Sequence, residues 1–293
     1  MKKISRRSFL AAAGLSVAAL ALTACGGSSA STASSVASSA AASSEAASTS
    51  AAAGELTTVE AGKLTMATNA TFPPYEMTTD AGDIEGIDVE TAQAIADKLG
   101  LELQIDDMDF DAALLSVQQG KADIVMAGVT VTDERKAVMD FSDSYATGIQ
   151  SIIVPEGSDI ASPDNLAGKK IVIASPDDLA GKKIGTQRGT TGYIYCSDDF
   201  GDDAVVAYDN GLTAVQALNN GQVDAVVIDN APAKEYVAAN PGLAILDTSY
   251  AEEDYAIGMA KGSSLEAAVN AALEELKADG TLQAIVDKYI TAE

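Results

Sequence analysis

"IDVETAQAIADKLGLELQI", residues 87–105, contains a helix and the strand that follows it, and this pair decides the fold of the body. Apolar residues recur at helical spacing from Ile87 to Leu99, and Gly100 then supplies a helix stop signal. The next residues, "LELQI", alternate apolar and polar side chains and are typical of a strand. A helix that leads directly into a strand is the repeating unit of parallel α/β sheets.

The same alternation of helix and strand continues on both sides of this unit. In the first half we expect the strand "KLTMAT", the helix "FDAALLSVQQG" and the buried strand "DIVMAGV". The second half repeats the pattern with "KKIGTQ", "TTGYIYCSD", "AVVAY", "LTAVQALNNG", "VDAVVID" and "APAKEYVAANP". The chain closes with the strand "YAIGMAKG" and the helices "SSLEAAVNAALEELKADG" and "TLQAIVDKYI". Two α/β units are therefore predicted.

Composition excludes several classes of function. The first 24 residues carry four cations and no acid, so the remaining chain has 14 bases against 43 acids, a net charge of −29. Such a surface repels phosphate backbones, and nucleic acid is not an expected partner. The absence of histidine removes the usual general base and the commonest metal ligand. We expect no cofactor and no metal, since the acid-rich segment 107–118 lacks the glycine and the final glutamate of a calcium loop.

The N-terminal segment predicts export. A basic start is followed by an apolar stretch from Phe9 to Leu20, which is short for a membrane span and is typical of a signal peptide over residues 1–24. "LTACG" resembles the lipobox of bacterial lipoproteins, which implies that Cys25 is acylated and becomes the first residue of the mature chain. A plain secretory signal is the alternative. "SRRSFL" also resembles a twin-arginine export motif, so the export route stays open.

Residues 25–57 are almost entirely Ser, Ala, Gly and Thr after the cysteine, and they lack the apolar bulk needed to pack. A flexible tether is expected there, with a partly helical alanine run as the alternative. A tandem duplication follows later in the chain, where "ASPDNLAGKKIVI" and "ASPDDLAGKKIGT" occupy 161–186 and share 10 of 13 positions. The second copy runs directly into "QRGTTGY", so we expect it to supply the turn, short helix and strand that belong to the fold. The first copy is then a surface excursion or an added edge strand.

Five motifs of the body resemble those of extracytoplasmic amino-acid-binding proteins of ABC importers, the glutamine- and histidine-binding group (solute-binding protein family 3). They are "ATNATFPPYEM", "GIDVETAQAIADKLG", "MDFDAALLSVQQGKADIVMAGVTVTDERKAVMDFSDSY", "GKKIGTQRGTTG" and "VDAVVIDNAPAKEYV". The resemblance implies the type II periplasmic-binding-protein fold: two lobes, each a mostly parallel sheet flanked by helices, joined by two hinge strands. Lobe 1 would comprise 58–147 and 252–293, and lobe 2 would comprise 148–251. A monomer is expected.

Arg135 is one of only two arginines after the leader. A guanidinium can hold a carboxylate with two parallel hydrogen bonds, which the ammonium of lysine cannot do. By the resemblance, Arg135 binds the α-carboxylate of a free amino acid; the alternative is an ion pair with Asp133 or another surface acid. If Thr132 caps the helix "DERKAVM", Arg135 falls in its first turn, where the helix dipole disfavours a cation, and a compensating anion is expected nearby. The other arginine, Arg188, could reach the cleft or lie on the surface.

The resemblance implies further ligand contacts from both lobes. Asp229 would bind the α-ammonium or, alternatively, would only cap the next helix. Thr191 would donate to the carboxylate or would be a simple helix N-cap. The remaining implied ligand-binding residues are Asn69, Phe72, Phe110, Gly128, Thr130 and Gln187. The two phenylalanines would stack on the ligand side chain, or they would be ordinary core residues. Cys196 is expected to pack as a small hydrophobe.

Two departures from the family pattern bear on specificity. Asn69 stands where relatives often have aspartate, and Gln187 stands where the glutamine-binding members have lysine. A cationic ligand side chain loses a partner at Asn69, so a polar uncharged amino acid is preferred. The expected function is capture by cleft closure outside the cell membrane, on a lipid anchor, and delivery to an ABC permease. The rivals are an exported dehydratase-like enzyme of the same fold, although no enzymatic activity is expected, and a ligand-sensing partner of a receptor.

Overall fold

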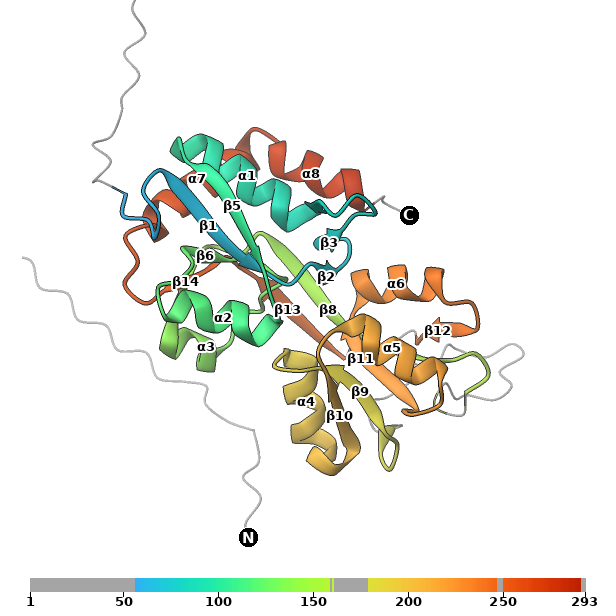
Figure 1. Cartoon of the computed structure of the whole chain (residues 1–293). Helices are drawn as coiled ribbons and strands as arrows, with labels where there is room; N and C mark the ends of the chain where they lie inside the picture. Colours follow the sequence, from blue (N-terminus) through green and yellow to red (C-terminus); the bar gives the residue numbers. More distant parts are fainter. Residues whose placement is uncertain (1–55, 159, 161–178, 247–249, 291–293) are drawn as a thin grey trace, which may run out of the picture. The chain divides into compact units, whose positions relative to one another are not determined.

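The computed structural model describes residues 56–158, 160, 179–246 and 250–290, and these form the two-lobed body of Figure 1. The leader with Cys25, the tether up to residue 55 and the first copy of the duplicated segment lie outside the described residues. From the second copy, the strand β9 is described, and it lies inside the sheet of the second lobe. This is the place that the sequence predicted for the second copy.

The sheet of the first lobe has the strand order β5-β1-β6-β14-β7. The bounds are β1 Lys63–Thr68, β5 Glu102–Asp107, β6 Ile124–Val125, β7 Met139–Phe141 and β14 Gly258–Ala260. Both β5 and β6 run parallel to β1, whereas β14 runs antiparallel to β6 and β7. The predicted parallel arrangement is therefore correct for the three strands β5, β1 and β6. The predicted strand "DIVMAGV" is shorter than expected, because its last residues turn away to form a loop of the site.

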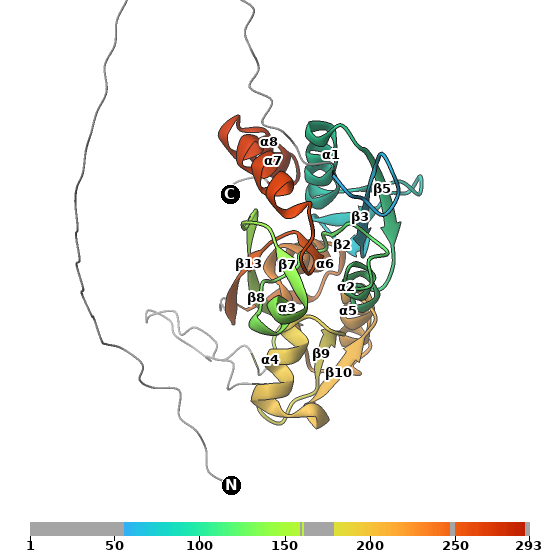
Figure 2. The same ribbon diagram turned by 90° about the vertical axis from the view of Figure 1, so that its left-hand side faces the viewer.

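Helices cover both faces of this first sheet (Figures 1 and 2). The bounds are α1 Ile87–Leu99, α2 Phe110–Gln118, α3 Asp133–Val138, α7 Glu266–Ala278 and α8 Thr281–Tyr289. On one face α1 packs against α7 and α8, and α2 contacts β1, β6 and β14 from the other face. In α1 the predicted apolar stripe is buried from Ile87 to Ala96 and half-buried at Leu99, and Gly100 ends the helix in the left-handed conformation with φ 69°.

The sheet of the second lobe has the order β10-β9-β11-β8-β12, with β13 also paired to β8. The bounds are β8 Ala146–Pro155, β9 Ile184–Gln187, β10 Val205–Tyr208, β11 Ala225–Asp229, β12 Leu243–Ile245 and β13 Ala251–Tyr255. The helices are α4 Thr191–Phe200, α5 Gly211–Asn219 and α6 Asn230–Ala239, with a short 3₁₀ turn at Asp202–Ala204. The strands β9, β10 and β11 are parallel, and β8 is antiparallel to β11.

The central strand β11 shows why the four residues "AVVI" of "VDAVVID" form a continuous apolar run. Ala225 and Val227 pack in the cluster that contains Cys196 of α4, whereas Val226 and Ile228 pack on the opposite side with residues of α5 and α6. Because both faces are covered, successive side chains are all buried. Cys196 is fully buried in this core, as expected, and burial raises the pKa of its thiol to about 12.

Two antiparallel strands connect the lobes (Figure 1). The first part of β8, from Ala146 to Gln150, pairs with β13, and the remainder of β8 pairs with β12. The strands β8 and β13 are the two hinge strands that the resemblance to the binding-protein fold implied. The predicted strand "YAIGMAKG" is in fact divided, since Tyr255 ends β13 and β14 begins at Gly258. The division lets the chain leave one sheet and enter the other.

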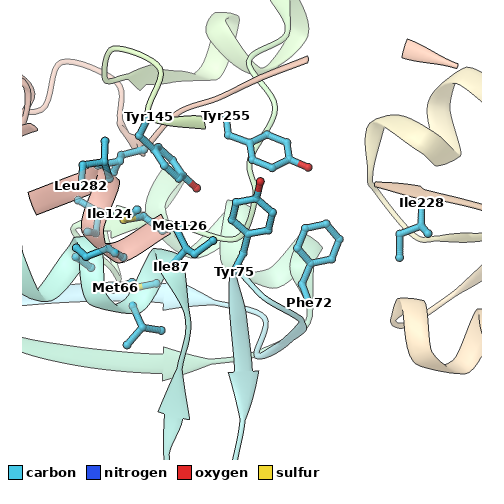
Figure 3. Packing of buried hydrophobic residues seen from close by; sticks show 14 of the residues in the cluster. Met66, Phe72, Tyr75, Ile87, Ile124, Met126, Tyr145, Ile228, Tyr255 and Leu282 are labelled. Carbon is cyan, nitrogen blue, oxygen red and sulfur yellow. The ribbon is translucent and has the colours of Figure 1, made fainter. Parts of the chain in front are cut away.

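A small antiparallel sheet within the first lobe, separate from its main sheet, was not predicted. It consists of β2 Thr71–Phe72, β3 Glu76–Thr78 and β4 Ile84–Glu85, in the order β2-β3-β4. Strands of two or three residues are too short to show a period in the sequence. This sheet places Phe72 and Tyr75 in a row of rings that ends at Tyr255, with centroid distances of 5.9 and 5.2 Å (Figure 3).

No helix within the described part of the chain has both the length and the apolar character that crossing a membrane requires.

Candidate functional site

One cavity between the lobes is lined by all nine residues that the sequence predicted to bind ligand. They are Asn69, Phe72, Phe110, Gly128, Thr130, Arg135, Gln187, Thr191 and Asp229. Glu76, Ala127 and Thr190 also line it and were not singled out. Most of these residues follow or end the parallel strands β1, β6, β9 and β11. Carboxyl ends of parallel strands meet at one edge of an open sheet, which is where such folds bind ligands.

Arg135 lies in the first turn of α3, as predicted, because Thr132 is the N-cap and its hydroxyl accepts from the Arg135 backbone N–H at 3.1 Å. Arg135 is 9% exposed, and its guanidinium lies over the Phe110 ring, 5.4 Å from the ring centroid. It donates to the Thr130 carbonyl at 2.7 Å and to the Gly189 carbonyl of the second lobe at 3.1 Å. Among the described residues no carboxylate forms an ion pair with it. The alternative of a surface ion pair is therefore wrong.

The anion expected near Arg135 is Glu253 of β13. Burial lowers the pKa of the Arg135 guanidinium, and the Glu253 charge acts in the opposite direction. Glu253 Oε2 accepts hydrogen bonds from the hydroxyls of Thr130 and Thr191, at 3.1 and 3.0 Å, and from the Gln150 amide at 3.0 Å. This single oxygen of Glu253 thus links one residue from each lobe to the hinge strands β8 and β13. Its other oxygen, Oε1, is buried without a hydrogen-bond partner in the described part of the chain.

Asp229 ends β11 and occupies the N-cap position of α6, but its side chain makes no capping hydrogen bond. Its two oxygens instead accept from the Tyr255 hydroxyl and from the Gln150 amide, the latter at 2.8 Å. The alternative of a simple helix cap is therefore not supported. Burial is the main cause that raises the pKa of Asp229 to about 7, and the neighbouring Glu253 charge adds to this. A buried carboxylate with a raised pKa is suited to receiving a cation.

Asn69 and Gln187 bridge the cleft. The Gln187 amide donates to Asn69 Oδ1 at 2.9 Å, and the same oxygen accepts from Thr71 at 3.0 Å. The Asn69 amide group donates to the Met108 carbonyl at 2.9 Å. Both hydrogen-bonding groups of the Asn69 side chain are therefore already engaged by the protein, which limits what this residue can offer a ligand.

Gly128 lies in the loop after β6 with φ 56°, and a Cβ at this position would be 2.8 Å from Cε1 of Phe72. Only glycine allows the loop to approach the ring this closely. The Gly128 N–H donates to Asp88 Oδ2 at 3.0 Å, so its carbonyl is the backbone group left for a ligand. Asp88 Oδ1 accepts from the Tyr145 hydroxyl at 2.7 Å, and burial raises the pKa of Asp88 to about 6.

The structure also places four further residues that the sequence singled out. The N-cap of α4 is Thr190, whose hydroxyl accepts from the Tyr193 N–H, so the alternative role of Thr191 as N-cap is wrong. Phe72 and Phe110 are both buried and both line the cavity. Arg188 lies on the surface, 58% exposed in its side chain and 3.7 Å from Asp209.

Sequence reasoning missed Glu76, Thr190, Glu253 and Gln150. Glu253 carried a usable signal, because strand alternation in "AEEDY" places it on the same face as the buried Tyr255. Glu76 stands beside the pair Pro73-Pro74 in a segment without periodicity, and nothing in its spacing marks it as buried. Thr190 and Thr191 are adjacent, and only the position of the helix start separates their roles.

Comparison with known proteins gives a consistent result. The family model of bacterial extracellular solute-binding proteins, family 3, matches residues 64–292. A probable histidine-binding protein of Neisseria gonorrhoeae is 32% identical over 289 residues, which are 96% of this chain and 95% of that protein. The L-cystine-binding protein TcyJ of Escherichia coli (strain K12) is 32% identical over 239 residues, which are 80% of this chain and 85% of that protein. A solved structure of an ancestral arginine-binding protein bound to glutamine is 40% identical with a TM-score of 0.72, and the match covers 79% of this chain and 99% of that one.

Proposed function

The chain belongs to family 3 of the bacterial extracellular solute-binding proteins, and on that premise we propose that it captures a free amino acid outside the cytoplasm and delivers it to the permease of an ABC importer. The relatives named for histidine, cystine and arginine support an amino acid as the ligand. Members of this family bind solutes rather than transform them, so the chain is not an enzyme and the dehydratase-like alternative is set aside.

The observation that carries this proposal is the pair of opposite charges in one buried cavity. Arg135 and Asp229 both line it, and both are at most 9% exposed. A free amino acid presents a carboxylate and an ammonium on the same carbon atom, and this pair of charges is complementary to a guanidinium and a carboxylate. Arg135 receives the α-carboxylate, with the backbone N–H of Thr191 as a second donor because the Thr191 hydroxyl donates to Glu253. Asp229 receives the α-ammonium. Phe72 and Phe110 contact the ligand side chain.

Closure of the cleft is expected because both lobes contribute residues to the cavity. Arg135 donates to Gly189 across the cleft, and Gln187 donates to Asn69 in the same direction. A ligand that contacts both lobes favours the state in which they touch. The lobes, 58–147 with 252–293 and 148–251, would move about β8 and β13. With these hydrogen bonds across the cleft, the two lobes are in the closed state.

A thermal-shift screen tests the proposed function. The purified full chain, unfolded and refolded to remove bound ligand, is heated with each of the twenty amino acids and with simple sugars, peptides and dicarboxylates. A ligand at 100 times its Kd adds about 2.7 kcal/mol to the free energy of unfolding, which raises the Tm by several degrees. We expect this for one or a few amino acids. The same ligand should reduce the radius of gyration in small-angle scattering; shifts with sugars alone would refute the proposal.

The lipid anchor has its own test. The sequence "LTACG" supports acylation of Cys25, which would hold the body at the outer face of the membrane. Cys25→Ser removes the acyl acceptor, and the protein is expected to move from the membrane fraction to the soluble fraction after cell lysis. Cys196→Ser is the matched control, because this thiol is buried in the second lobe. Membrane association that survives Cys25→Ser would contradict the anchor.

A further inference from the structure

Gln150 lies at the point of β8 where this strand changes partners. It is opposite Asp229 of β11 on one side and opposite Ala251 of β13 on the other. Side chains directly opposite each other in an antiparallel pair have Cβ atoms about 5 Å apart, so Gln150 is within reach of the ammonium acceptor. Glu253 follows Ala251 by two residues and therefore lies on the same face of β13. Gln150 is 1% exposed and is not among the residues that line the ligand cavity.

One amide group of Gln150 serves two buried carboxylates. Its nitrogen donates to Asp229 Oδ2 at 2.8 Å and to Glu253 Oε2 at 3.0 Å. Its oxygen is buried without a hydrogen-bond partner in the described part of the chain. That oxygen faces Gly192 of α4, where a Cβ would come within 2.8 Å of it. The amide thus satisfies both carboxylates while its own oxygen stays unpaired, and glycine at position 192 leaves room for this orientation.

A neutral donor suits this place because Asp229 must keep its negative charge for the ligand. Hydrogen bonds to an ionised carboxylate stabilise the ionised form. A lysine or an arginine would stabilise it more strongly, but the positive charge would neutralise Asp229 and repel the α-ammonium. An apolar side chain would leave both buried carboxylates without this donor, which is costly. Glutamine supplies the hydrogen bonds and adds no charge.

The protonation of Asp229 depends on opposing effects. Burial is the largest and raises its pKa to about 7; hydrogen bonds from Tyr255 and Gln150 lower the pKa, and the Glu253 charge raises it. The other titratable groups whose charge interacts with Asp229 are Tyr75, Glu76, Arg135 and Tyr195, and Lys234 and Glu235 of α6 line a second cavity together with it. Loss of the Gln150 donor would therefore favour the protonated form of Asp229.

We propose that Gln150 is a positioning residue for ligand binding, whose amide keeps the Asp229 carboxylate oriented and ionised so that it can receive the α-ammonium. This inference rests on the proposed function, because it assumes that Asp229 binds the ammonium. The two residues are cross-strand neighbours in one sheet, so a rigid-body rotation of the lobes leaves the pair intact. The competing explanation is that Gln150 only packs within the hinge strand.

The test measures how ligand affinity depends on pH in the full chain. The probes are L-glutamine and L-arginine, whose side chains do not titrate between pH 5.5 and 8.5. If neither binds, the amino acid with the largest shift in the thermal screen replaces them. The α-ammonium of the ligand titrates equally with every variant, so comparison with the wild type removes its contribution.

Gln150→Met keeps the length of the side chain and removes the donor. Loss of one hydrogen bond should raise the pKa of the carboxyl group by about one unit. Titration calorimetry should then show affinity lower than that of the wild type by about ninefold at pH 6, about fivefold at pH 7 and less than about twofold at pH 8.5. A residue that only packs would weaken binding by the same factor at every pH.

Three further variants serve as controls. Ser151→Ala is the matched control, because Ser151 is the next residue of β8, is equally buried and loses a hydrogen bond with Asn230. It should retain the wild-type dependence on pH. In the Asp229→Asn background, Gln150→Met should act equally at every pH, because no proton competes there. Gln150→Asn withdraws the amide by one methylene and should shift the dependence in the same direction as Gln150→Met. It keeps the inference testable if Gln150→Met folds poorly.

Each outcome supports or overturns the inference. Unchanged affinity in Gln150→Met and Gln150→Asn, or a loss by the same factor at every pH, would overturn it and leave Gln150 as a packing residue. A wild-type affinity that is constant from pH 5.5 to 8.5 would also overturn it, while the proposed function would stand. Failure of every amino acid to bind would reject the proposed function itself.

Discussion

Arg135→Ala is expected to weaken binding of the amino acid by about 4 kcal/mol, roughly a thousandfold in Kd. The variant would leave the ligand carboxylate in a buried site without its charged partner, and such truncations are costly because one charge stays buried and unpaired. It would also remove the hydrogen bond from Arg135 to Gly189, which joins the two lobes. Titration calorimetry with the ligand identified in the thermal screen measures the loss.

Two further variants show whether the loss reflects the shape of the guanidinium. Arg135→Lys retains the charge but not the planar fork, so binding should weaken by about 2 kcal/mol. Arg188→Ala is the matched control, since it removes the other arginine of the body, which is on the surface beside Asp209. It should change the binding free energy by less than about 0.5 kcal/mol. Wild-type affinity in Arg135→Ala would remove Arg135 from the ligand-binding site.

Arg135 also illustrates what the sequence could predict. Its position after "TVTD" indicated a capped helix, and its residue type indicated a carboxylate ligand, because both are local properties. The hydrogen bonds that hold its guanidinium come from Thr130 and from Gly189, and the second partner lies 54 positions away in the chain. Neither the periodicity nor the spacing of residues in the sequence indicates a contact between such distant positions. The residue type therefore predicted which ligand group Arg135 would bind. The positions of its hydrogen-bond partners could be known only from the folded structure.

The same distinction explains the fold. Elements with a clear signal were predicted correctly, since the burial of α1 follows from its helical spacing and that of β11 follows from its continuous apolar run. The small sheet β2-β3-β4 was missed because its strands are stabilised by pairing with each other rather than by a pattern of their own. Glu76 belongs to that sheet. A buried residue that lines the cavity thus lies in the segment with the weakest sequence signal.

Asp229→Asn is expected to weaken binding by about 3 kcal/mol, roughly 150-fold in Kd, because the α-ammonium loses its charged acceptor. Asparagine has the same shape, and its amide can still pair with Gln150 and Tyr255, so the fold should be retained. Asp209→Asn is the matched control, because this carboxylate is 74% exposed and lies beside Arg188. Equal affinity of Asp229→Asn and the wild type would place the ammonium elsewhere.

The pH dependence gives a second measurement of the same assignment. In the closed arrangement without ligand, burial raises the pKa of Asp229 to about 7, so below that pH a proton occupies the carboxylate and must leave before the ammonium binds. Affinity should fall by up to tenfold for each pH unit below 7, and it should lose this dependence in Asp229→Asn.

The stability of the closed protein without ligand should change in the opposite direction with pH. A carboxyl group whose pKa is raised by folding stabilises the folded state at low pH, and this contribution is lost as pH rises from about 4, the usual value, to about 7. Asp88, with a pKa of about 6, adds to the same loss in both proteins. Chemical denaturation across this range should therefore show a smaller decline for Asp229→Asn than for the wild type. Parallel curves would mean that Asp229 is ionised throughout, and the ammonium would then bind without displacing a proton.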